Sequence, residues 1–192
     1  MLEGLHSLDQ EITLAINSVH CTLSDSLWIF MSDKKVWAPF YVLALTLLIW
    51  RLGWKKALIV TAGIVLSILA CDQLGNVVKD SVCRLRPCYN TYMLDNGLRM
   101  LEGRGHHFGF YSAHAADSFG FVTCMAFCLY ELDKENSNRR YICIGIFWAF
   151  MVAVSRVFVG KHFFGDVLVG AMVGCVIGYA ISKLATLAAR RV

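Results

Sequence analysis

Long apolar stretches, separated by short polar ones, form the main pattern along the chain. Five stretches are rich in apolar residues, at positions 36–50, 57–78, 113–130, 141–154 and 163–185. A helix needs about 20 apolar residues to cross a bilayer, so the first and fourth stretches must recruit flanking residues. The pattern predicts an all-α fold, a polytopic transmembrane helical bundle with at least five membrane helices.

A different pattern precedes the first of these stretches. Apolar residues recur at roughly helical intervals between Glu3, Asp9 and Glu11, which predicts an N-terminal amphipathic helix. Two placements fit this helix equally, one along the membrane surface and one packed against the protein. A short apolar segment at 27–31 either crosses the bilayer or only dips into it, which gives five to six membrane helices. The first twenty residues contain no Lys or Arg, so they are expected to belong to the mature protein rather than to a signal peptide.

The composition agrees with a membrane protein of one domain. The chain has 192 residues, of which 57% are hydrophobic and two are proline, and its mean hydropathy is +0.57. This is too apolar for a soluble domain and too short for several domains. We expect a single membrane-embedded domain over residues 1–192, with an amphipathic or re-entrant segment at 1–33 and a helical core at 36–187 that holds the candidate chemistry.

Charge and cysteine content narrow the partners. The formal charge of +4 is scattered between apolar stretches, without a basic run interleaved with aromatic residues, so a nucleic-acid surface is not expected. An anionic lipid or phosphate suits the positive sign better, and the oligomeric state stays open. Most of the eight cysteines fall inside apolar stretches, where a thiol behaves as a small hydrophobe. Cys83 and Cys88 bracket Arg86, and the sequence leaves open whether they form a disulfide.

Charged residues cluster at the ends of the apolar stretches in three groups. The groups are Lys79 with Arg86 and Pro87, then Ser112, Ala113 and His114, then Ser155 and Arg156 with His162 and Asp166. Several cations can hold the negative oxygens of a phosphoryl group. One imidazole can attack phosphorus while a second protonates the departing oxygen. These residue types therefore indicate phosphoryl chemistry at a membrane surface.

The spacing within the three groups resembles the tripartite signature of the type 2 phosphatidic acid phosphatase family. Six residues separate Lys79 from Arg86, five separate Arg156 from His162, and three separate His162 from Asp166. The matching part, 79–166, spans almost half of the chain. The second motif departs from the usual Pro-Ser-Gly-His, because Tyr111 and Ala113 stand in the first and third places.

The resemblance implies a role for each residue. It makes His162 the nucleophile that forms a phosphohistidine, and Asp166 the carboxylate that holds the ring. His114 becomes the general acid for the leaving group and later the base that activates water. The phosphate-binding set is Lys79, Arg86, Ser112, Ala113 and Arg156. The resemblance also implies a six-helix core, and the mechanism needs no metal or cofactor.

Spacing alone supports the pairing of His162 with Asp166, because residues four apart share one face of a helix. A zinc site made by these two side chains with His106 or His107 is the alternative, although no tight ligand cluster is present.

Other polar residues receive supporting roles. Arg84 is interpreted as an anchor at the membrane edge or a headgroup contact. Asp72 and Asp117 are each expected either to support the site residues from behind or to pair with a buried cation. Glycines at 170, 174 and 178 repeat every four residues in the last span, a ridge that favours packing within the chain over dimerisation. The irregular loop at 86–111 is expected to overhang the site.

The number of spans predicts which side of the membrane holds the site. With five spans, the loops after the second and fourth face the same side, and these loops hold the candidate residues. The 18 Lys and Arg residues divide equally between the two sides. When Lys79, Arg86 and Arg156 are set aside as phosphate ligands, the opposite side is the more positive and is expected to be cytoplasmic. We expect a bacterial inner-membrane protein whose site faces the periplasm or cell exterior.

The sequence therefore predicts an integral membrane, metal-independent phosphatase that acts on a lipid phosphate monoester or pyrophosphate. The candidate substrates are undecaprenyl pyrophosphate, lipid A 1-phosphate, phosphatidylglycerol phosphate and phosphatidic acid. A non-catalytic protein that binds or transports phosphate lipids is the alternative. A vanadate-dependent haloperoxidase would share the anion pocket, but those proteins resemble larger soluble folds.

Overall fold

Helices make up the regular structure of this protein, whose computed structural model describes the backbone of residues 2–136 and 138–192 and the side chains of 4–136 and 138–192. No strand occurs in these residues, so the all-α prediction is confirmed. The α-helices are α1 Leu2–Ser18, α2 Thr22–Ser32, α3 Ala38–Leu52, α4 Trp54–Val82, α5 Thr91–Asp95, α6 Ala113–Leu132, α7 Arg139–Phe158 and α8 Phe164–Ala189. Two short 3₁₀-helices, η1 Lys34–Trp37 and η2 Pro87–Tyr89, precede α3 and α5.

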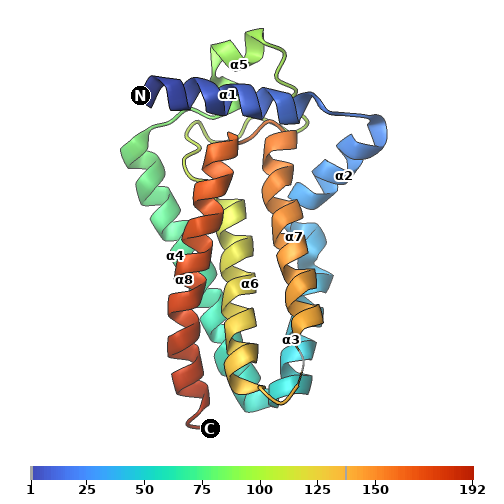
Figure 1. Ribbon diagram of the computed structural model, residues 1–192, viewed down its shortest axis with the longest axis vertical. Helices are drawn as coiled ribbons and strands as arrows, with labels where there is room; N and C mark the ends of the chain where they lie inside the picture. Colours follow the sequence, from blue (N-terminus) through green and yellow to red (C-terminus); the bar gives the residue numbers. More distant parts are fainter. Residues whose placement is uncertain (1, 137) are drawn as a thin grey trace.

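Five helices of the described chain are long and apolar enough to cross a membrane. They are η1 continued by α3, α4, α6, α7 and α8. The eleven residues of α2 reach only about 16 Å, roughly half of a bilayer core. The structure thus favours five spans over six. In Figure 1, α1 lies across one end of the bundle and α2 slants beside α7, while the C-terminus lies at the opposite end.

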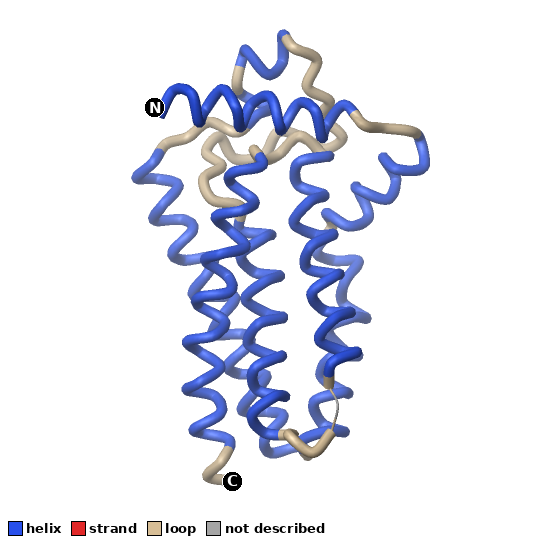
Figure 2. The backbone as a smooth tube through the Cα atoms, viewed as in Figure 1, coloured by secondary structure: helices blue, strands red, loops and turns tan. Residues whose placement is uncertain are grey.

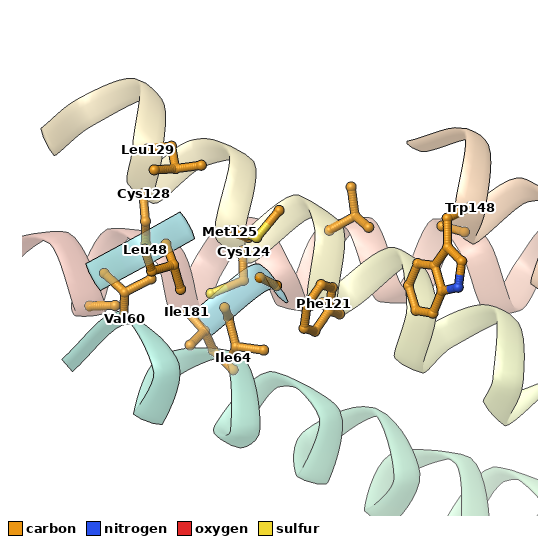
Figure 3. Close-up of a cluster of buried hydrophobic side chains, with 14 of the residues drawn as sticks. Leu48, Val60, Ile64, Phe121, Cys124, Met125, Cys128, Leu129, Trp148 and Ile181 are labelled. Carbon is orange, nitrogen blue, oxygen red and sulfur yellow. The ribbon is translucent and has the colours of Figure 1, made fainter. Parts of the chain in front are cut away.

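The bundle is built around α6, which packs against α4, α7 and α8. The smooth trace in Figure 2 shows these long helices running side by side. Figure 3 shows the largest buried cluster, in which Phe121 and Met125 of α6 meet Ile64 of α4 and Trp148 of α7. The ring of Trp148 stacks on Phe40 of α3 at a centroid distance of 4.5 Å. Apolar contacts of this kind fix the long helices and therefore the ends that carry the site.

The glycine ridge of α8 faces α6. A Cβ atom on Gly170 would lie 2.5 Å from the carbonyl oxygen of Ser112, and one on Gly178 would lie 2.6 Å from that of Gly120. The backbones of the two helices approach too closely for any side chain at these positions. The ridge therefore packs within the chain, as the sequence favoured.

The second half of α1 packs on the protein through both polar and apolar side chains. Gln10, Thr13 and Asn17 are buried, whereas Leu5 and Leu8 are exposed. The side-chain amide of Asn17 donates to the carbonyl oxygens of Val157 and Phe158, at 3.1 and 2.9 Å, at the C-terminal end of α7. Leu14 and Ile16 are partly buried against apolar clusters of the bundle. Packing on the protein therefore describes the second half of α1, while the exposed Leu5 and Leu8 point away from the bundle.

Candidate active site

The candidate residues come together at the end of the bundle that α1 covers. Each of them occupies the end of a helix or an adjacent loop: Lys79 at the end of α4, Arg86 before η2, Ser112 and Ala113 with His114 at the start of α6, Arg156 in the last turn of α7, His162 in the turn after it, and Asp166 in the first turn of α8. The ends of α4, α6, α7 and α8 meet here because these helices run side by side (Figure 1). The loops that follow α4 and α7 both lie at this end of the bundle.

His162 lies in the turn before α8, because α8 begins at Phe164. The expectation that the histidine and its carboxylate share a helix face is therefore replaced by a tighter arrangement. Asp166 folds back over the turn, and its Oδ2 accepts a hydrogen bond of 3.1 Å from the backbone N–H of Phe163. The same oxygen lies 3.5 Å from Nδ1 of His162. This leaves the second ring nitrogen, Nε2, free of the carboxylate.

Burial and nearby positive charge disfavour protonation of the His162 ring. The side chain is almost completely buried, and burial lowers the pKa of His162 well below its ordinary value. The positive charges of Arg156, Arg86 and Lys79 lower that pKa further. A neutral ring retains the lone pair that a nucleophile needs.

A glycine that the sequence did not single out makes room for Arg86. A Cβ on Gly109 would lie 2.8 Å from Cγ of Arg86 and 3.3 Å from Oδ2 of Asp166. The loop is held in place because Arg86 Nε donates to the carbonyl oxygen of Phe108 at 3.2 Å and its backbone N–H donates to that of His107 at 2.9 Å. The loop therefore overhangs the site, as expected, and presses one cation towards the nucleophile.

Arg156 is buried and has partners that the sequence did not suggest. Its guanidinium donates to the hydroxyl of Ser32, at the end of α2, and lies 3.6 Å from the carboxylate of Glu102. The Ser32 hydroxyl donates to that carboxylate in turn. Nearby, the ammonium of Lys161 donates to the carbonyl oxygen of Gly103. Residues far apart in the sequence thus complete the cation cluster.

His114 opens onto a cavity of about 250 Å³. Aromatic residues of the bundle, including Trp37 and Trp148, line this cavity together with Lys34 and Asp117. The carboxylate of Asp117 binds the ammonium of Lys34 at 2.6 Å. Asp117 is a buried carboxylate paired with a cation, as the sequence indicated, but the cation is Lys34, whose side chain is 49% exposed rather than buried.

Arg84 is not a membrane anchor, and that interpretation was wrong. Its guanidinium donates to Oδ1 of Asp166 at 2.7 Å and to Oδ2 of Asp9 at 2.6 Å. It also lies over the ring of Phe163, 4.2 Å from the centroid. The side chain faces the protein because two carboxylates, from α1 and α8, outcompete the solvent for it.

Several polar atoms in this region are buried without a hydrogen-bond partner among the described residues. They include Oγ of Ser112, Oδ1 of Asp117, Nε of Arg156 and Nδ1 of His162. Buried polar atoms are rarely left unpaired in folded proteins, so a cluster of them indicates a place for a bound polar group.

The zinc and disulfide alternatives receive no support from the arrangement of the described side chains. Residues 4–136 and 138–192 hold no group of three or more His, Cys, Asp or Glu side chains that could bind a metal ion. His107 instead stacks on Tyr89 with a centroid distance of 4.2 Å. Cys83 is exposed, Cys88 is buried, and both are free thiols. Independence from metal stays a prediction.

Comparison with known proteins identifies the family to which the residues of this site belong. The family model of the PAP2 superfamily matches residues 56–189, which include all three motifs. The chain belongs to the PAP2 superfamily. Two curated relatives are lipid A 4'-phosphatases. That of Bacteroides thetaiotaomicron is 33% identical over 91% of this chain and 75% of its own. That of Porphyromonas gingivalis is 26% identical over 95% of this chain and 75% of its own.

Solved structures share the fold. The transmembrane PAP2-type phosphatidylglycerolphosphate phosphatase of Bacillus subtilis superposes with a TM-score of 0.73 at 19% identity, covering 94% of this chain and 86% of that one. The LpxE protein of Aquifex aeolicus superposes with a TM-score of 0.65 at 21% identity, covering 90% and 93%. Family, relatives and apolar helices together make this PAP2 protein an integral membrane lipid phosphatase. The non-catalytic alternative is set aside.

Proposed function

We propose that this enzyme removes the 4'-phosphate of lipid A through a phosphohistidine formed on His162. The observation that carries the chemistry is a buried imidazole with Asp166 behind it and with the charges of Arg156, Arg86 and Lys79 lowering its pKa. A phosphoryl group placed among these cations would meet the free Nε2 of His162. The unpaired Nε of Arg156 and Oγ of Ser112 would then gain partners.

The proposed reaction has two steps. In the first, Nε2 of His162 attacks phosphorus and the bond between phosphorus and the lipid oxygen breaks, while His114 donates a proton to that oxygen. The three cations balance charge on the phosphoryl oxygens, and Asp166 stabilises the cationic ring. In the second step, His114 accepts a proton from water, which attacks the phosphohistidine and releases phosphate. The phosphoryl oxygens stay bound to Lys79, Arg86 and Arg156 in both steps, and the backbone N–H of Ala113 donates a further hydrogen bond to them.

The lipid assignment rests on the relatives. Both lipid A 4'-phosphatases match more than nine tenths of this chain, which spans 75% of each of them. The 4'-phosphate was not among the substrates predicted from the sequence, which included lipid A 1-phosphate. The cavity beside His114 supports a large leaving group, since aromatic walls suit a lipid body and Lys34 at its edge suits a charged headgroup.

The enzyme would act on lipid A at the outer face of the inner membrane, with the site periplasmic, as the charge distribution favours. A cysteine near Gly103 should then react in intact cells with a reagent that cannot cross the inner membrane, whereas one near Asn136 should not. Labelling near Asn136 and none near Gly103 would show that the topology is the reverse of the one proposed.

The substrate is tested with purified enzyme in detergent and lipid A carrying phosphates at both the 1 and 4' positions. Mass spectrometry of the product should show loss of the 4'-phosphate only, and His162→Ala should leave the lipid intact. Activity should survive dialysis against a strong chelator. Release of the 1-phosphate, or hydrolysis of undecaprenyl pyrophosphate or phosphatidylglycerol phosphate alone, would overturn the lipid assignment and leave the chemistry standing.

A further inference from the structure

A row of alternating charges connects the N-terminal helix with the proposed nucleophile. Asp9 of α1 binds one nitrogen of the Arg84 guanidinium at 2.6 Å, and Asp166 of α8 binds another at 2.7 Å. The far oxygen of Asp166 faces His162 at 3.5 Å. Arg84 is therefore shared by two carboxylates, of which only one touches the nucleophile.

The sharing changes the charge that His162 experiences. A carboxylate paired with a single guanidinium forms a nearly neutral unit, which would stabilise a cationic ring only weakly. Asp9, Arg84 and Asp166 together carry a net charge of about −1, so the row stays negative next to the ring. This charge is useful when His162 attacks phosphorus, because the ring then becomes cationic.

The contact with α1 is built into the start of α8. The first N–H groups of a helix have no partner within it. The N–H of Phe164 donates to Oγ1 of Thr13 at 3.0 Å, and that of Gly165 donates to Oδ1 of Asp9 at 2.8 Å. A Cβ on Gly165 would lie 2.8 Å from Oδ2 of Asp9, so glycine permits this close approach. Both oxygens of Asp9 are thus used, one on α8 and one on Arg84.

We infer that Asp9 is a positioning residue for the nucleophile: by sharing Arg84 with Asp166, it keeps the carboxylate next to His162 effectively negative during phosphoryl transfer. The inference rests on the proposed role of His162. Asp9 lies outside the three motifs, and α1 precedes the residues matched by the family model. Arg84 occupies one of the six spacer positions between Lys79 and Arg86.

The test removes the charge of Asp9 but keeps the hydrogen bond that caps the start of α8. In Asp9→Asn the amide oxygen can still accept from Gly165, while the negative charge is lost. We expect kcat to fall by roughly 10-fold with KM within about 2-fold of wild type, because the loss concerns a charge formed in the transition state. Rapid-quench experiments should show slower formation of the phosphohistidine.

Matched variants separate charge from structure. Glu11→Gln removes an exposed carboxylate from the same helix and should leave kcat unchanged. Thr13→Ala removes the other cap of α8 without changing charge. It should lower the melting temperature and leave kcat nearly unchanged. Asp9→Glu keeps the charge and should retain kcat within about 3-fold, which tests the inference even if Asp9→Asn folds poorly.

A double-mutant cycle with Arg84→Gln decides the mechanism. If Asp9 acts by balancing Arg84, the effect of Asp9→Asn on kcat should largely disappear in the Arg84→Gln background. The same loss in both backgrounds, or a kcat for Asp9→Asn equal to that of Glu11→Gln, would overturn the inference. His162→Ala is measured alongside: an active His162→Ala enzyme refutes the proposed nucleophile, whereas an inactive one with normal Asp9→Asn refutes only the role of Asp9.

Discussion

His162 and His114 are each followed within about one helical turn by an aspartate that binds one cation, yet the two surroundings differ. Around His162, Asp166 is fully buried and its partner Arg84 is held by a second carboxylate. Around His114, the partner of Asp117 is Lys34, whose side chain is 49% exposed, and one oxygen of Asp117 is unpaired. The half around His162 is buried and held by ion pairs, whereas the half around His114 borders a cavity.

The difference follows from what each histidine must meet. The proposed nucleophile attacks the same atom, phosphorus, in every turnover, so a fixed ring with a single free nitrogen gives the best alignment. The proposed acid serves the oxygen that carries the lipid, and that half of the site must admit a bulky group. A rigid half and an open half therefore fit one reaction with two different partners.

The largest effect should come from removing the histidines one at a time. His162→Ala should lower kcat by at least about 10³-fold, because no phosphoenzyme can form. His114→Ala should lower kcat by about 10²- to 10⁴-fold but should accumulate an acid-labile phosphohistidine after rapid quenching. Equal losses without any trapped phosphoprotein in His114→Ala would remove the distinction between the two halves.

A smaller effect is expected from Gly170, which sets the separation of the two halves. The backbone N–H of Ser112 donates to the carbonyl oxygen of Asp166 at 3.0 Å, next to the point where Gly170 meets α6. Gly170→Ala should destabilise the fold by about 1–3 kcal/mol through overpacking and lower kcat as the halves separate.

Thermal unfolding in detergent and kcat measure both consequences of Gly170→Ala. Gly4→Ala is the matched control, since nothing lies within 4 Å of a Cβ at that position. An unchanged melting temperature for Gly170→Ala would contradict the prediction that close packing of α6 and α8 at this position stabilises the fold.

Lys34→Gln should act more mildly, because the Lys34 side chain is 49% exposed and lies at the edge of the cavity. Lys34 has no part in the proposed reaction, so kcat should stay within about 3-fold of wild type. KM for a lipid with a charged headgroup should rise, because Lys34 borders the cavity. Steady-state kinetics measure both constants, and a kcat loss as large as that of His114→Ala would make this half as rigid as the other.

The smallest effect concerns protonation without any mutation. Burial and three cations lower the pKa of His162, so the ring should still be neutral at about pH 6, where an ordinary histidine is largely charged. Nitrogen NMR of ¹⁵N-histidine-labelled enzyme in micelles, assigned with His162→Ala, measures this directly. A midpoint for His162 at or above about pH 6.5 contradicts the electrostatic picture of the fixed half.

The sequence predicted the spans and the motif residues because both depend on local patterns. Runs of apolar residues mark α4, α6, α7 and α8, and fixed spacings mark His162 with Asp166. The supporting contacts were missed because their partners are remote: Arg84 lies 75 positions from Asp9, and Ser32 lies 124 positions from Arg156. Nothing in the local sequence distinguishes Arg84 from a lysine or arginine that faces lipid, so only folding reveals its carboxylate partners.

The docking of α1 on α8 also orders events during synthesis. The first helix is made before every span, and Thr13 must wait for Phe164, 151 positions later, before it can cap the last one. A nascent chain that ends within α7 already carries Lys79, Arg86 and His114 but lacks both His162 and Asp166. On the proposed roles of His162 and Asp166, hydrolysis is expected to begin only after α8 has been made, so chains that end within α7 should not attack the lipids around them.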